Sequence, residues 1–140
     1  MRAVAAVLGL VLLGTACSET QSTTAPSTDT IASPTTTETF SATLSVGGFS
    51  FYSFVVGQNG TVNVTLVSVS GTDVPSTVTL GLAIGIPSGT GCSGGSVTST
   101  AAGTDPQVTS TYSPGRYCVN VSDVGNLAAP ATFTVTIAHP

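Results

Sequence analysis

The sequence predicts an all-β protein: a single antiparallel β-sandwich of about seven short strands, preceded by a signal peptide and a disordered tether. Charged residues make up only 6% of the 140 residues and lysine is absent, so Thr, Ser, Gly and Asn supply the polar surface. Val and Thr favour strands, whereas the best helix formers are largely charged or long side chains. Apolar and polar residues alternate from Phe40 onward, which is the strand period. No helical periodicity follows Leu13, and the length fits one domain.

The first segment has the layout of an export signal. Arg2 is followed by an apolar run from Ala3 to Leu13, which is too short to span a bilayer as a stable helix. Small residues, including Gly14 and Ala16, then lead to Cys17. This arrangement resembles a bacterial lipoprotein signal, in which the cysteine that ends the signal receives the lipid. Ordinary secretion, with cleavage after the small residues, is the alternative interpretation.

The chain is therefore expected to have three parts: a signal peptide over 1–16, a lipid-anchored linker over 17–38, and a domain over 39–140. From Ser18 to Glu38 the linker is almost only Ser, Thr, Pro and acidic residues. It cannot bury enough apolar surface to offset the entropy of ordering. A flexible chain of this length spans about 25 Å, which suits a spacer between membrane and domain. The protein is expected to be exported and anchored by its lipid to the bacterial cell envelope, on the periplasmic or the cell-surface face.

Three strands are expected in the first half of the domain. The run from Phe40 to Val46 alternates, and the run from Phe49 to Val56 is apolar on both faces. Between the second and third runs, Asn59-Gly60 predicts a two-residue hairpin, because both residues tolerate positive φ. The third run changes parity near Leu66, which predicts a β-bulge. Side chains expected to face inward are Phe40, Ala42, Leu44, Val46, Tyr52, Phe54, Val56, Val62, Val64 and Leu66.

The second half opens with the cleanest alternation, from Val78 to Ile86, with Val78, Leu80, Leu82, Ile84 and Ile86 on one side. Pro87 to Pro106 is rich in Gly, Ser and Thr and is expected to be a long loop. Loops of this length are usually either functional or loose. Because loops on a rigid sandwich carry recognition, this one is the expected contact surface. Further strands are expected over Val108–Tyr112, Tyr117–Val121 and Phe133–Ile137.

The mature chain would contain three cysteines. If Cys17 is acylated, Cys92 and Cys118 remain, and an exported protein lies in an oxidising compartment. A disulfide between them is therefore expected. A metal site is not expected, because His139 is the one histidine and two thiolates do not make a zinc site.

No catalytic residues or cofactors are expected. The stretch from Gly91 to Gly95 matches the G-x-S-x-G pattern around Ser93, but that pattern functions on a strand-to-helix turn beside a histidine base. Here it lies in a Gly/Ser segment with no helix following, and His139 is the one imidazole. The expected domain contains three carboxylates, Asp73, Asp105 and Asp123, which lack calcium-loop spacing and are expected to form turns.

Charge limits the partners. Without residues 1–16 the chain retains Arg116 and six carboxylates, which gives 1 − 6 = −5. Such a surface cannot neutralise phosphates, so nucleic-acid binding is not expected. A neutral glycan or the edge of a protein remains as a ligand. Tyr52, Tyr112 and Tyr117 would stack on sugars if exposed, although at least two are expected in the core.

A family resemblance covers the whole domain. It rests on the strand patterns of Gly48–Val56, Val62–Leu66, Val78–Leu82 and Phe133–Ile137, and on the Pro-Gly-x-Tyr turn within Ser113–Val121. These segments resemble the bacterial pre-peptidase C-terminal domain family. The resemblance implies a β-sandwich accessory module that binds matrix or polysaccharide. The expected function is a non-catalytic envelope lipoprotein that binds polysaccharide or protein; the alternative is a structural envelope lipoprotein without a specific ligand.

Overall fold

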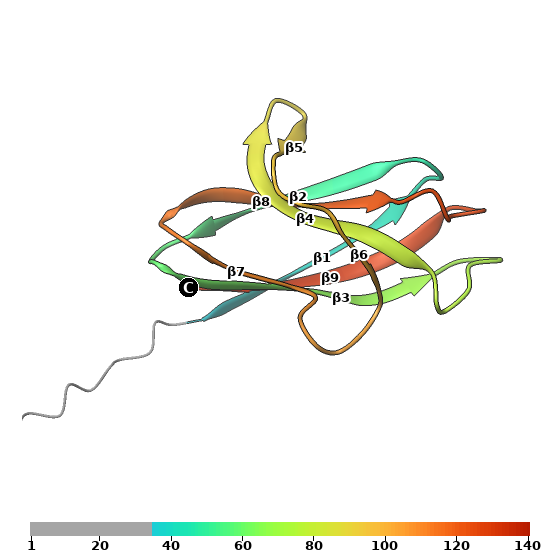
Figure 1. The fold of residues 1–140 in the computed structure, drawn as a ribbon, viewed down its shortest axis with the longest axis horizontal. Helices are drawn as coiled ribbons and strands as arrows, with labels where there is room; N and C mark the ends of the chain where they lie inside the picture. Colours follow the sequence, from blue (N-terminus) through green and yellow to red (C-terminus); the bar gives the residue numbers. More distant parts are fainter. Residues whose placement is uncertain (1–34) are drawn as a thin grey trace, which may run out of the picture. The chain divides into compact units, whose positions relative to one another are not determined.

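A computed structural model describes residues 35–140, which form two antiparallel β-sheets packed face to face (Figure 1). The predicted all-β sandwich is confirmed. Among these residues, no helix is long and apolar enough to cross a membrane. The nine strands of the described part are β1 (Thr36–Leu44), β2 (Phe49–Val56), β3 (Gly60–Ser70), β4 (Thr79–Ser88), β5 (Gly91–Ser93), β6 (Thr98–Ala101), β7 (Val108–Tyr112), β8 (Gly115–Asp123) and β9 (Ala131–His139).

Most consecutive strands lie in opposite sheets. One sheet has the order β1-β9-β3-β7, and the other has the order β2-β8-β4-β5, with β6 also paired to β4. Because β2 and β3 belong to different sheets, the Asn59-Gly60 turn connects the sheets, and the predicted hairpin is wrong. A turn-forming dipeptide reverses the chain in either case, but it does not determine which strand becomes the hydrogen-bonded neighbour.

The core lies between the sheets and contains the alternating side chains of both. Two expected core residues, Val46 and Ile86, are instead 52% and 64% exposed. β1 ends at Leu44, so Val46 lies in the turn beyond the sheet. Ile86 pairs with Ser93 in the β4–β5 hairpin, which extends past the body of the sandwich in Figure 1. The fully buried larger side chains are Leu44, Val56, Val62, Val64, Leu66, Leu80, Leu82, Val119, Val121, Phe133, Val135 and Ile137.

The four-stranded sheet confirms one sequence prediction, the bulge in β3, and corrects another, the start of the domain. The register between β3 and β9 shifts between Leu66 and Ser68, which confirms the predicted bulge. β1 begins at Thr36, so three residues of the expected linker 17–38 belong to the sheet. Glu38 pairs with Ile137 in this extension, and a domain start at residue 39 is therefore too late.

The segment expected to be a long loop, Pro87 to Pro106, contains β5 and β6 and packs against β4. β4 leaves room for it, because Gly81, Ala83 and Gly85 occupy its outward positions and are buried. A Cβ added at Gly85 would collide with the backbone carbonyl of Ser93. The segment therefore continues the five-stranded sheet along the edge of β4, and the residues between β5 and β6 lie close to the outward side of β4. Its Gly/Ser composition reflects close backbone packing.

Candidate binding faces

Of the residues predicted from sequence, Cys92 and Cys118 are joined by a disulfide with a Cα–Cα distance of 5.8 Å. The bond connects β5 to the outward side of β8, across the edge of β4. Cys118 is fully buried, whereas Cys92 is half-buried. The predicted disulfide is confirmed. Cys17, the predicted lipidation site, lies outside the described residues.

The serine motif is not assembled into a nucleophile elbow. Ser93 is the exposed last residue of β5, and Gly94 and Gly95 follow it with positive φ. Within residues 35–140, no hydrogen bond connects Ser93 to His139. His139 is instead buried at the end of β9, with its ring 5.2 Å from that of Phe54.

A polar cluster of Glu38, Tyr52 and His139 connects the two sheets along the side where β1 and β2 are both edge strands. His139 Nε2 lies 2.9 Å from Glu38 Oε1, and the Tyr52 hydroxyl donates a hydrogen bond to Glu38 Oε2. The Tyr52 hydrogen bond, more than the nearby imidazole, lowers the pKa of Glu38, although partial burial opposes this. The same carboxylate raises the pKa of Tyr52. The cluster therefore holds β1 against both β9 and β2.

Asp123 organises the opposite end of the fold. Its carboxylate accepts hydrogen bonds from the backbone N–H groups of Gly47, Gly125, Asn126 and Leu127, and these bonds, led by that from Gly47, lower its pKa. This turn-forming role matches the sequence prediction. No group of three or more potential metal ligands occurs within residues 35–140.

The outward side of the four-stranded sheet carries an array of hydroxyl groups that was not predicted from the sequence. Three strands contribute three residues each, and the backbone register aligns them in three rows across the sheet. Every one of the nine positions is Thr or Ser. We call this array the hydroxyl face; its rows are Thr39, Thr136 and Thr65; then Ser41, Thr134 and Ser68; then Thr43, Thr132 and Ser70.

Strand geometry sets the spacing of the hydroxyl face. Adjacent strands lie about 4.8 Å apart, and outward residues on one strand repeat about every 6.7 Å, so the array covers about 10 by 13 Å. On β1 all three members are exposed, and on β9 they range from exposed to half-buried. On β3, Ser68 and Ser70 are exposed, whereas Thr65 is buried. Two cross-strand contacts order the rows: Ser41 Oγ lies 2.8 Å from Thr134 Oγ1, and Thr43 Oγ1 lies 3.4 Å from Thr132 Oγ1.

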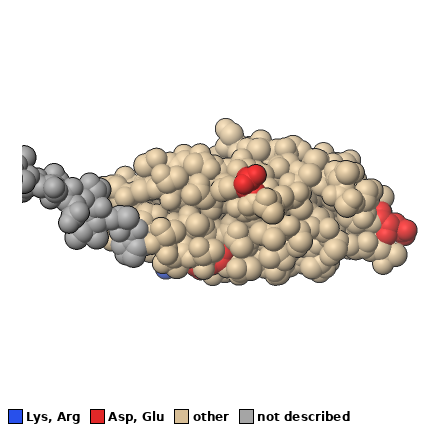
Figure 2. Space-filling view, turned by 90° about the horizontal axis from the view of Figure 1, so that it is seen from below, with Lys and Arg blue, Asp and Glu red and all other residues tan. Residues whose placement is uncertain are grey.

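The hydroxyl face extends toward β7 without gaining charge. Beyond the array, Asn63 Oδ1 accepts a hydrogen bond from Thr109 Oγ1, and Thr61 pairs with Thr111. The side of the molecule in Figure 2 is mostly uncharged, with one acidic group near the middle of the view and further acidic groups and a basic group at its margin. The outward side of the four-stranded sheet thus presents hydrogen-bond donors and acceptors, and its positions on β1, β9, β3 and β7 contain no ionisable side chain.

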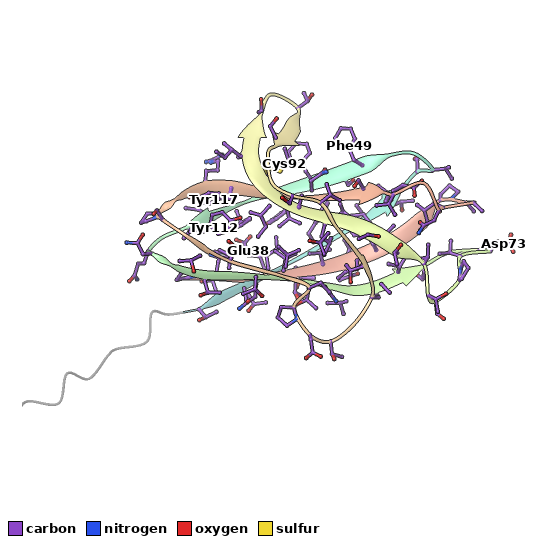
Figure 3. The ribbon with its side chains drawn as sticks, in the orientation of Figure 1. Glu38, Phe49, Asp73, Cys92, Tyr112 and Tyr117 are labelled. Atoms are coloured by element: carbon purple, nitrogen blue, oxygen red, sulfur yellow. A yellow bond between two sulfur atoms is a disulfide. The ribbon has the colours of Figure 1, made fainter. Side chains whose placement is uncertain are left out.

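Tyrosines lie at the end of the sandwich where β9 terminates. The rings of Tyr112 and Tyr117 are 4.6 Å apart, and the Tyr117 hydroxyl donates to the carbonyl of Ser113. Figure 3 shows both between the layers. Both, like Tyr52, are partly buried and pack against the core. These tyrosines therefore lie at the edge of the core. They do not form a row of exposed rings beside the hydroxyl face.

Sequence patterning contained part of the signal for the hydroxyl face. The Thr-x-Thr-x-Thr spacing of β9 and the alternating Thr and Ser of β1 show that each strand has a hydroxyl side. Only the pairing of β1, β9 and β3 makes them one surface. Glu38 falls in the predicted linker because the stretch from Ser18 to Glu38 is almost only Ser, Thr, Pro and acidic residues.

No family of known proteins matches the chain, and no curated relative matches it.

Proposed function

We propose that the chain is a non-catalytic lipoprotein of the bacterial cell envelope whose sandwich binds neutral polysaccharide through the hydroxyl face. The observation that supports this most strongly is the uncharged three-by-three array of Thr and Ser on β1, β9 and β3. The resemblance to the pre-peptidase C-terminal domain family supports the same kind of ligand.

The chemistry of the face fits neutral sugars. Each Thr or Ser hydroxyl donates one hydrogen bond and accepts others, which matches the hydroxyl groups of a polysaccharide. The described part contains Arg116 and four carboxylates, which gives 1 − 4 = −3, and the hydroxyl face itself has no cation to bind an anionic polymer. Contacts between uncharged groups are little affected by salt. Binding is therefore expected to be weak per site and insensitive to ionic strength.

The cellular location follows from the sequence. A lipid on Cys17 would hold the domain at the membrane, and stable anchoring requires more than one acyl chain. Replacing Cys17 with Ser is expected to release the protein from membranes into the soluble fraction. A mature protein whose N-terminal mass shows no lipid would contradict the anchor.

Glycan binding is tested by affinity electrophoresis of the full chain through gels containing mannan, arabinogalactan or dextran, with heparin as the charged comparison. The variant Thr39→Val/Thr136→Val removes two hydroxyls of one row while keeping side-chain shape and strand propensity. Neither hydroxyl is hydrogen-bonded to another described side chain. The matched control is Thr90→Val/Thr98→Val, which removes two exposed hydroxyls near the five-stranded sheet.

We expect retardation by at least one neutral polymer, reduced severalfold by the row variant and unchanged by the control or by added salt. Retardation that collapses with salt would contradict an uncharged contact. Absence of retardation in every polymer, together with an altered envelope after deletion of the gene, would favour the structural lipoprotein instead.

A further inference from the structure

The outward side of the five-stranded sheet differs in character from the hydroxyl face. Outward positions on β2 are Phe49, Phe51, Ser53 and Val55, which alternate with the inward Tyr52, Phe54 and Val56. Phe49 is 61% exposed and Val55 is 55% exposed. In Figure 3 the Phe49 ring projects away from the sandwich.

Two further valines extend this surface across β8 to β4. A Cβ placed on Gly81, an outward position of β4, would lie 2.7 Å from Val97 and 3.1 Å from Val124. The backbone register places Ser122 between Phe49 and Gly81, so the valines share a row with Phe49. We call Phe49, Phe51, Val55, Val97 and Val124 the apolar face. Along β2 it extends about 20 Å.

The apolar face has a single charge. Arg116, the one Arg or Lys in the described part, is exposed and pairs across the strands with Val55. The outward positions of β2, β4 and β8 contain no carboxylate. Asp123, at the end of β8, has its carboxylate occupied by four backbone N–H groups.

We propose that the apolar face docks on the surface of a phospholipid bilayer, with Phe49 and Val55 entering the interface and Arg116 meeting lipid phosphates. The charge pattern selects this partner. A second copy of the chain would offer Arg116 no carboxylate from the same face, whereas phosphate groups of lipids supply the missing charge. Exposed aromatic and aliphatic side chains beside a cation are typical of interfacial membrane contacts.

The consequence is a defined orientation. The apolar face and the hydroxyl face lie on the outward sides of opposite sheets. A domain resting on lipid by the first would direct the second away from the membrane. The inference does not depend on glycan binding, and the two are tested by different measurements.

The chain contains no tryptophan, so a single introduced tryptophan is a unique fluorescent reporter. The variant Phe49→Trp places it on the apolar face. The matched control Val67→Trp places it on β3 of the other sheet, where Val67 is 45% exposed. Each full-length variant is incorporated into vesicles of phosphatidylcholine and phosphatidylglycerol whose acyl chains are brominated, and association is checked by flotation.

We expect strong quenching and a blue shift for Phe49→Trp and neither for Val67→Trp. Adding Arg116→Gln is expected to lower the docking equilibrium constant of the apolar face, measured by quenching, about fivefold on anionic vesicles. The reason is that one cation near such a surface contributes about 1 kcal/mol. The same change should matter little on pure phosphatidylcholine. A floating Phe49→Trp protein without quenching would overturn the proposal, as would failure of the protein to float. A blue shift that depends on protein concentration and not on lipid would assign the face to a second copy.

Discussion

Removing the disulfide tests how the segment from residue 87 to 106 is held on the sandwich. The variant Cys92→Ala/Cys118→Ala opens a covalent loop whose ends are 26 residues apart. Chain-entropy arithmetic for a loop of this length gives a loss of about 3.5 kcal/mol in the free energy of unfolding. Small domains have about 5–15 kcal/mol in total, so the variant is expected to remain folded but with little margin.

The expected decrease in melting temperature is about 14 °C, taking about 4 °C per kcal/mol for a domain of this size. It is measured by circular dichroism of wild type and variant, each with and without reductant. Reductant should lower the melting temperature of the wild type toward that of the variant and leave the variant unchanged. Melting temperatures that agree within a few degrees would contradict this expectation, because residues 87–106 would then stay paired with β4 without the covalent link.

Two more perturbations follow from named contacts. Because the pKa of Glu38 is lowered in the fold, its carboxylate stabilises the fold above the ordinary carboxyl pKa, and this stabilisation is lost as the pH falls through the lowered value. Glu38→Gln should therefore make the melting temperature less sensitive to acid than in wild type, and an unchanged acid dependence would contradict the role of the cluster. Gly95→Ala should cost about 2–3 kcal/mol, because it combines positive φ with a collision against the Ile84 carbonyl. The control Gly94→Ala has positive φ but open space around its Cβ, so it should cost about 1 kcal/mol; equal effects would show that the close approach to β4 is not limiting.

Local patterning predicted most strands well. The strand Val108–Tyr112 has the predicted bounds, and the change of parity near Leu66 correctly indicated the bulge. Both features depend on residues close in sequence. Alternation also identified the inward residues wherever a strand remained inside its sheet. It failed at Val46 and Ile86, because a pattern does not reveal where the opposing sheet ends.

Features that depend on strand pairing were not predictable from the sequence. Asn59-Gly60 signals a turn equally well within one sheet or between two. The Gly/Ser segment after Pro87 has the composition of a loop. Only the structure shows that it packs closely on Gly81 and Gly85 of β4. The hydroxyl face is assembled from strands that are far apart in the chain, β1 and β9 among them. The disulfide between Cys92 and Cys118 was predictable, because these two cysteines remain once Cys17 is set aside for the lipid.

The most direct test of the central claim maps the ligand contact on the protein itself. Amide chemical shifts of the isotopically labelled chain are followed during titration with an oligosaccharide prepared from the neutral polymer that retards it most. The largest shifts are expected on five residues of the hydroxyl face, Thr39, Ser41, Thr134, Thr136 and Ser68, and they should persist at high salt. Shifts centred on residues 87–106, or no shifts at ligand concentrations that saturate retardation, would contradict that claim.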